Sequence, residues 1–128
     1  MTLIKNTKPT EGELEILQVL WQKGSATVRE VHEQLNTYKD SGYTTTLKLM
    51  QIMYEKGMLK RDDSNMKHVY SPTEEEQKTK NDLLEKFIDG MYNGSASNLV
   101  MQLLGNKKTS KKEIAAIKEL LNKMDKDK

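Results

Sequence analysis

One local signal marks the predicted start of four helices along this 128-residue chain and sets their order. Each occurrence is a serine or threonine followed three residues later by a glutamate. This is the capping-box pattern, in which the hydroxyl and the carboxylate satisfy backbone N–H groups at the start of a helix. The boxes begin at Thr10, Thr27, Thr73 and Ser110. Apolar residues at helical spacing follow them, so four helices are predicted.

Two further helices and a hairpin are predicted between these boxes. The stretch SGYTTTLKLMQIMYEKGMLKR, residues 41–61, has helical periodicity over about 43–56 and stops at Gly57. Residues 58–61 and 67–71 have the character of strands joined by a polar turn, which predicts a β-hairpin. A short apolar helix is predicted from Ser95 to about Leu104.

The resulting order is three helices, a hairpin and three more helices. The first four elements have the order of a winged helix-turn-helix, in which the third helix enters the major groove of DNA and the hairpin forms a wing beside it. The predicted fold is therefore mainly α. A winged helix-turn-helix domain is expected over residues 1–72 and a helical dimerisation region over residues 73–128, with the boundary near Pro72.

The apolar stripes after Pro72 predict that two chains associate. Hydrophobic residues make up 35% of the chain and charged residues 31%, which gives a thin core for this length. Three helices with apolar stripes have too little mass to bury those stripes within one chain. The residues expected at the contact between two chains are Leu83, Leu84, Phe87, Ile88, Leu99, Val100, Leu103, Leu104, Ile114, Ile117, Leu120, Leu121 and Met124.

Composition excludes several classes of function. The chain has no cysteine, so disulfides and thiol chemistry are excluded, and His32 and His68 each lack a second ligand at metal-binding spacing. No catalytic set is recognisable, so neither an enzyme nor a metal or cofactor site is expected. No apolar run approaches the ~20 residues that span a bilayer, which predicts a soluble, cytoplasmic protein.

The predicted third helix has two chemically different faces. Thr46, Met50, Met53 and Tyr54 are expected to face the core. The other side carries short hydroxyls, a cation and an amide, which can bond phosphates and base edges in the major groove. The residues expected to contact DNA are Thr44, Thr45, Leu47, Lys48 and Gln51 on this helix, with Arg29, Arg61 and Lys67 near the DNA backbone.

Two other interpretations of this face remain open. Threonines at the start of a helix often only cap it, and a lysine and a glutamine on a helix surface are often only solvated. A net charge of +2 gives weak support to a nucleic-acid partner. The alternative function is therefore a winged-helix module that binds another protein, without sequence-specific DNA binding; a basic surface around the third helix would argue against it.

Three stretches of the sequence resemble a known family. They are EGELEILQVLWQKGSATVREVHEQL (11–35), GYTTTLKLMQIMYEKGMLKR (42–61) and HVYSP (68–72). They are similar to the penicillinase repressors of the BlaI and MecI type, and the likeness extends over essentially the whole chain. The resemblance implies a homodimeric transcriptional repressor that binds an inverted repeat in promoter DNA and has no small-molecule substrate.

The resemblance also implies a mode of regulation. In β-lactam-responsive members, a membrane sensor metalloprotease leads to cleavage in the dimerisation region, and the position corresponds here to Gln102–Leu103. This chain departs from the family pattern at that pair, which is Gln-Leu in place of Asn-Phe, and at Ile52, where many members have arginine. Without cysteines, the chain also differs from the copper-responsive branch.

Overall fold

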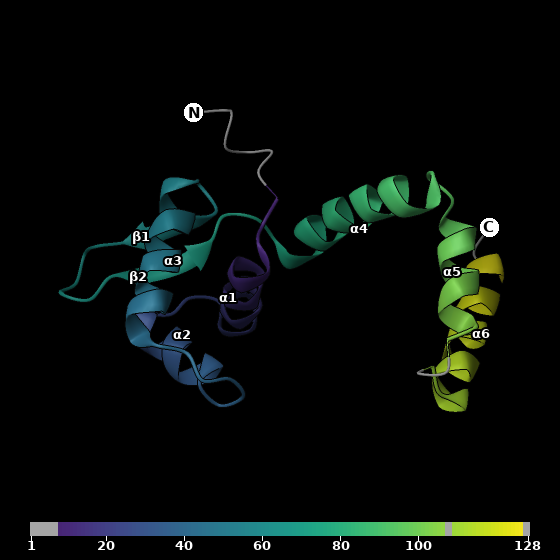
Figure 1. Ribbon diagram of the computed structural model, residues 1–128, viewed down its shortest axis with the longest axis horizontal. Helices are drawn as coiled ribbons and strands as arrows, with labels where there is room; N and C mark the ends of the chain where they lie inside the picture. Colours follow the sequence, from purple (N-terminus) through teal and green to yellow (C-terminus); the bar gives the residue numbers. More distant parts are fainter. Residues whose placement is uncertain (1–7, 107–108, 127–128) are drawn as a thin grey trace. The chain divides into compact units, whose positions relative to one another are not determined.

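The structure, a computed structural model, describes residues 8–106 and 109–126 and is mainly helical (Figure 1). By compactness, its residues divide into two units, one ending at Asn81 (the winged unit) and one starting at Asp82 (the helical unit). The predicted winged helix-turn-helix followed by a helical region is confirmed. The elements are α1 (Glu11–Lys23), α2 (Val28–Leu35), α3 (Tyr43–Glu55), β1 (Leu59–Asp62), β2 (Val69–Pro72), α4 (Glu76–Tyr92), α5 (Ala96–Leu104) and α6 (Lys111–Lys126).

Three of the four predicted capping boxes form. At the start of α1, the hydroxyl of Thr10 accepts from the backbone N–H of Glu13 at 3.2 Å, and the Glu13 carboxylate accepts from the Thr10 N–H at 3.0 Å. The boxes at Thr27 and Ser110 have the same two hydrogen bonds. The starts of α1, α2 and α6 are therefore set by contacts over three residues, which is why the sequence predicts them.

The box predicted at Thr73 does not form. The Thr73 hydroxyl donates instead to the backbone carbonyls of Gly57 (2.8 Å) and Met58 (3.1 Å), and the Thr73 N–H donates to the Met58 carbonyl at 3.0 Å. These bonds tie the exit of β2 to the connection between α3 and β1. Because the Thr73 N–H already donates to the Met58 carbonyl, it is not left for the Glu76 carboxylate, and α4 begins at Glu76.

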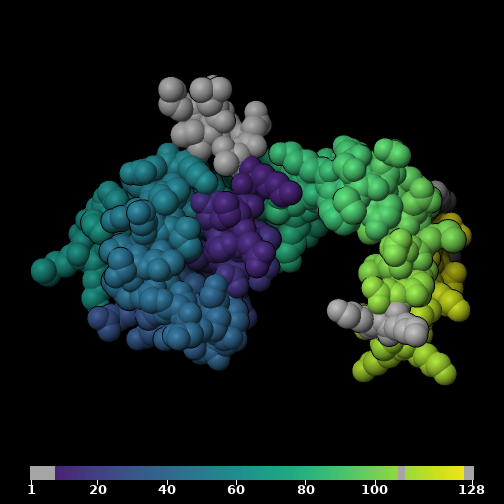
Figure 2. Space-filling model, viewed as in Figure 1, coloured from purple at the N-terminus to yellow at the C-terminus, as the bar shows by residue number. Residues whose placement is uncertain are grey.

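The winged unit has a closed core. Helices α1, α2 and α3 pack against one another, and the hairpin packs against α1 and α3. Figure 2 shows the atoms of the three helices adjoining one another on one face of this unit. Thr46, Met50 and Met53 of α3 are buried, as predicted. The buried hydrophobic residues are Ile16, Leu17, Val19, Leu20, Ala26, Val28, Val31, Leu35, Met50, Met53, Leu59 and Tyr70.

The hairpin is part of a slightly larger sheet than the sequence predicts. Strands β1 and β2 are antiparallel, with Arg61 opposite Tyr70 and each strand one or two residues later than expected. On the other side of β2, Ala26 pairs with Tyr70 through two backbone hydrogen bonds of 2.8 and 2.9 Å. This bridge fixes the connection between α1 and α2 against the hairpin.

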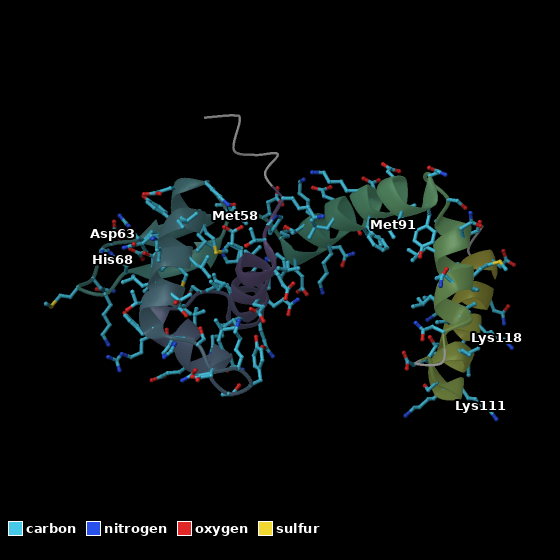
Figure 3. All side chains as sticks on the ribbon, viewed as in Figure 1. Met58, Asp63, His68, Met91, Lys111 and Lys118 are labelled. Carbon is cyan, nitrogen blue, oxygen red and sulfur yellow. The ribbon has the colours of Figure 1, made fainter. Side chains whose placement is uncertain are left out.

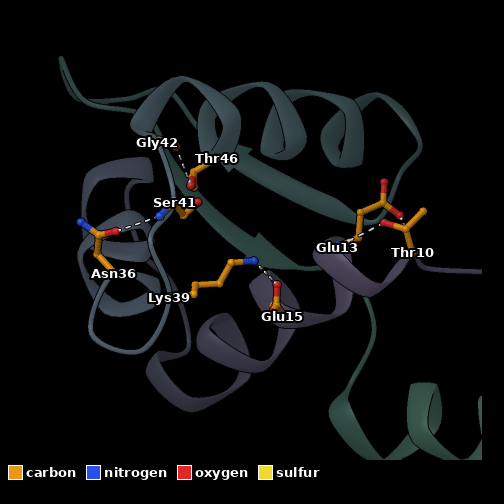
Figure 4. Close-up of polar contacts among 8 residues, drawn as sticks. All are labelled: Thr10, Glu13, Glu15, Asn36, Lys39, Ser41, Gly42 and Thr46. Atoms are coloured by element: carbon orange, nitrogen blue, oxygen red, sulfur yellow. Dashed lines mark hydrogen bonds and ion pairs between the residues drawn. The ribbon is translucent and has the colours of Figure 1, made fainter.

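The turn between α2 and α3 is held at both ends (Figure 4). The Asn36 side-chain oxygen accepts from the Ser41 N–H at 3.1 Å, and the Lys39 ammonium pairs with Glu15 of α1 at 2.8 Å. The turn therefore sets the direction in which α3 leaves α2.

The helical unit leaves its apolar side chains largely open. Among the described residues from Asp82 onward, none is buried. Of the side chains expected at a contact between two chains, Leu83, Ile88, Leu99, Leu104, Ile114 and Ile117 are half-buried. Those classed as exposed are Leu84, Phe87, Val100, Leu103, Leu120, Leu121 and Met124.

Candidate nucleic-acid interface

Helix α3 presents a polar face outward at its N-terminal end. Thr44, Thr45, Lys48 and Gln51 are all exposed, while the opposite side of the helix is buried in the core. Side chains with hydroxyl, ammonium and amide groups over the first three turns are what a helix needs to contact phosphates and base edges. The sequence predicts this face correctly because it depends only on helical periodicity.

The threonine run does not cap its own helix. The residue at the N-cap of α3 is Gly42, and no side chain makes the capping hydrogen bond. The buried Thr46 hydroxyl lies 3.5 Å from the Gly42 carbonyl, to which it donates (Figure 4). Thr44 and Thr45 are the second and third residues of α3, and both are exposed. Neither is the N-cap residue, so capping does not account for these threonines. An N-terminus without a side-chain cap also leaves backbone N–H groups for an anion such as phosphate.

Two residues of α3 lie differently from their predicted positions. Leu47, expected towards the groove, is half-buried and packs against the core. Tyr54, expected in the core, is 38% exposed, so that prediction is wrong. Its ring meets the buried Tyr70 ring edge-to-face at 6.5 Å, because the core space beside the helix is already occupied by Tyr70 of β2.

Arg61 of β1 faces the body of the winged unit. Its guanidinium carbon lies 4.3 Å from the centre of the Tyr54 ring, and its Nε lies 2.8 Å from the Asp63 carboxylate. A hydrogen bond with the Tyr70 side chain, followed by that with Asp63, raises the pKa of Arg61 further above its ordinary value. The guanidinium expected at a DNA phosphate is thus already engaged within the protein.

Asp63 also contacts His68 on the other side of the wing. The Nδ1 atom of His68 lies 2.6 Å from the same Asp63 oxygen that faces Arg61, and Figure 3 shows the two side chains together at the base of the loop. Sequence reasoning missed this cluster of Tyr54, Arg61, Asp63 and His68. Its members come from α3, β1 and the loop, so no local spacing could have revealed it.

Lys67 and Arg29 are both exposed, as DNA-backbone contacts require. Lys67 is close enough to α2 to act on its first turn. The pKa of Glu30 is lowered, mainly by the hydrogen bond from the Thr27 N–H. The charges of Lys23 and Lys67 lower it more weakly.

The charge of the winged unit is balanced overall. Residues 1–81 contain 12 Lys and Arg against 12 Asp and Glu, which gives a formal net charge of zero. Any attraction to DNA therefore depends on where the individual cations lie. The described residues also contain no group of three His, Cys, Asp or Glu side chains placed to hold a metal ion. None of the described helices is long and apolar enough to span a membrane.

Comparison with known proteins gives a consistent result. The penicillinase repressor family matches residues 9–123. The penicillinase repressor of Staphylococcus aureus is 25% identical over 122 residues, which cover 95% of this chain and 97% of that protein. The methicillin resistance regulatory protein MecI of Staphylococcus aureus (strain N315) is 27% identical over 119 residues, covering 93% and 97%.

A further relative matches about half of the chain. The transcriptional regulator BlaI of Mycobacterium tuberculosis is 30% identical over 71 residues, which cover 55% of this chain and 51% of that protein. Because the family match spans nearly the whole sequence, and because the winged helix and the helical region lie in the predicted order, the chain belongs to the penicillinase repressor family.

Proposed function

We propose that this protein is a homodimeric transcriptional repressor that binds an inverted repeat in promoter DNA. Helix α3 of each chain enters a major groove, and the two helices lie about one DNA turn apart, on the order of 34 Å or a multiple of it. Thr44, Thr45, Lys48 and Gln51 contact the DNA, with Lys67 and Arg29 near the backbone. The observation that carries this proposal is the exposed polar face of α3, whose threonines do not serve as caps.

The exposed apolar residues of the helical unit support dimerisation. Side chains such as Phe87 (47% exposed), Leu121 (53%) and Met124 (57%) leave much of their area in water within one chain. Burying apolar area stabilises an association by roughly 25 cal/mol per Å². A second copy of the helical unit, with the same stripes, would cover them. Pairing also doubles the number of phosphate contacts, which matters for a winged unit with balanced charge.

Release from DNA would follow from damage to the same region. Gln102 and Leu103 are exposed near the C-terminal end of α5, a helix of nine residues. Cleavage between them, by a membrane sensor metalloprotease in response to a β-lactam or cell-envelope signal, would remove apolar area from the contact between chains. A repressor with a weakened dimer loses half of its DNA contacts at once. Incubating the protein with a co-expressed sensor protease and sequencing the new N-terminus tests this step.

One observation favours the alternative of a protein-binding module. The net charge of zero over residues 1–81 is unusual for a domain that binds DNA, and Glu55 lies exposed on α3. A protein partner would need no basic surface. The two functions differ in their response to salt, because DNA binding releases counterions and weakens steeply as salt rises.

The test is a mobility-shift titration on DNA from the protein's own upstream region at several salt concentrations. We expect Lys48→Ala and Thr45→Ala each to weaken binding by about 1 kcal/mol or more. Lys118→Ala, which removes the same charge from α6, serves as the matched control and should bind as the wild type does. Unchanged affinity in both α3 variants would mean that α3 does not contact the DNA.

A further inference from the structure

Met66 stands at the tip of the wing with its side chain fully in solvent. Its relative exposure is 102%, against 72% for Met101, the next most exposed large hydrophobic residue in the described part of the chain. The loop that carries it, between β1 and β2, extends away from the helices (Figure 1). A side chain in this position contributes nothing to the core, so its apolar surface is open to a partner.

The loop is braced at its base. Asp63 lies 2.8 Å from Arg61 on the incoming strand and 2.6 Å from His68 on the outgoing side. The Asp62 carboxylate accepts from the Ser64 N–H at 2.9 Å. These contacts close the loop at residues 62–68, so that residues 64–67 form a short projecting tip.

The same cluster connects the tip to α3. Because the Arg61 guanidinium covers the Tyr54 ring at 4.3 Å, the base of the wing is fixed against α3. The Asp63 carboxylate is paired with Arg61, which offsets its repulsion of a phosphate, and the exposed Lys67 adds a positive charge next to Met66. If α3 lies in a DNA groove, the loop fixed to it would hold an apolar side chain, Met66, and a cation, Lys67, beside the neighbouring groove.

We propose that Met66 enters the minor groove next to the base pairs read by α3 and partly unstacks one base step. Apolar side chains, methionine among them, act as wedges of this kind in minor-groove proteins. Pyrimidine–purine steps unstack most easily, so the wedge would favour such a step at that position in the operator. This inference rests on the proposed function, because it requires α3 in the adjacent major groove.

The experiment uses the full-length protein and a duplex enriched by the wild type from a random-sequence pool. The fluorescent base 2-aminopurine is placed at the steps that flank the bases protected by α3. Four variants are compared: Met66→Gln, which keeps the length but is polar, Met66→Leu, which stays apolar, Lys67→Ala and Lys48→Ala. Since Met66 makes no core contact, its variants should fold as the wild type does, which thermal unfolding checks.

We expect Met66→Gln to weaken binding about tenfold, the scale of one lost base-pair preference, and to abolish the fluorescence increase at the flanking step. Met66→Leu should retain both. Lys67→Ala should lower the dependence of log K on log salt by about 1, whereas Met66→Gln should leave that dependence unchanged. If Met66→Gln binds and unstacks as the wild type does while Lys48→Ala weakens binding, the wedge is refuted and the proposed function stands. If Lys48→Ala also binds normally, the proposed function falls with it.

Discussion

The winged unit and the helical unit have opposite arrangements of their apolar side chains. Every buried residue in the described part of the chain lies between Glu13 and Thr79, in the winged unit. The helices of the helical unit are as regular as those of the winged unit. Helix α5 is more apolar in composition than α1, α2 or α3, yet no residue of α5 is buried. The first unit is therefore stabilised by contacts within the chain, whereas the apolar side chains of the second are left uncovered, as the proposed dimer requires.

A single reporter separates the two units experimentally. Trp21 is the only tryptophan in the sequence and packs against the core of the winged unit. Its indole N–H donates to the Glu74 carbonyl at 3.1 Å, so its environment changes when this unit unfolds. Tryptophan fluorescence therefore follows the winged unit alone, and sedimentation follows the association that we assign to the helical unit.

The largest effect is expected from a cavity in the winged core. Met50 is fully buried, and Met50→Ala should lower the free energy of unfolding by about 2–5 kcal/mol. Urea unfolding followed by Trp21 fluorescence should show the same loss at every protein concentration. Met66→Ala, at a fully exposed methionine, is the matched control and should stay within about 0.5 kcal/mol of the wild type. A loss that grows on dilution would mean that the winged unit is not self-sufficient.

The next largest effect is expected in the helical unit, at the proposed contact between two chains. Leu103→Asp places a charge on the apolar face of α5, and we expect a sedimentation shift from dimer to monomer at micromolar concentration, a change of about 2–3 kcal/mol in association. The Trp21 unfolding transition should remain where it is. Asn98→Asp adds the same charge at an exposed polar position of α5 and should leave the dimer intact. A persistent dimer in Leu103→Asp would take this face out of the interface.

A third effect tests Glu13, the one buried carboxylate among the described residues of the winged unit. Glu13 is 2% exposed and lies 2.9 Å from the Lys56 ammonium. Burial by itself would raise the pKa of Glu13, but hydrogen bonds from Thr10 and Lys56 outweigh it and hold that pKa below 4.5. Glu13→Gln should lower the free energy of unfolding at pH 7 by about 1–2 kcal/mol. Urea unfolding followed by Trp21 fluorescence at pH 7 and pH 3 measures this loss.

The sign of the pH dependence follows from that lowered pKa. The folded protein binds the Glu13 proton less readily than the unfolded chain, so the contribution is complete above pH 4.5 and is lost as the pH falls through the folded value. The difference between wild type and Glu13→Gln should therefore shrink on acidification to about pH 3. Glu15→Gln is the control: it removes a more exposed carboxylate, 28% exposed against 2% for Glu13, from its pair with Lys39 and should cost under about 1 kcal/mol. A difference that is constant with pH would contradict the assigned pairing.

The smallest effect concerns the caps. Thr27→Ala removes the hydroxyl that caps α2 and should lower the stability of the winged unit by about 1 kcal/mol. Ser110→Ala removes the corresponding cap of α6 and should leave the Trp21 transition unchanged, because α6 belongs to the other unit. A shift of that transition by Ser110→Ala would show that the two units unfold together.

Local patterns are enough to predict the starts of α1, α2 and α6, the order of the elements and the buried side of α3. These features depend on residues three or four apart, as in the boxes at Thr10 and Thr27 and in the burial of Thr46, Met50 and Met53. Local spacing is enough for them, because a capping bond or a helical face involves no distant part of the chain.

The features that join distant segments depend on tertiary packing and could not be predicted from local patterns. It diverts Thr73 from its predicted box to the carbonyls of Gly57 and Met58, pairs Ala26 with Tyr70, and moves Tyr54 out of the core to lie under Arg61. Each outcome depends on a residue 15 or more positions away: Thr73 bonds Gly57 across 16 positions, Ala26 pairs with Tyr70, and the Tyr54 ring meets the Tyr70 ring. The winner is set by how the hairpin packs against α1 and α3, and no short stretch of sequence contains that information.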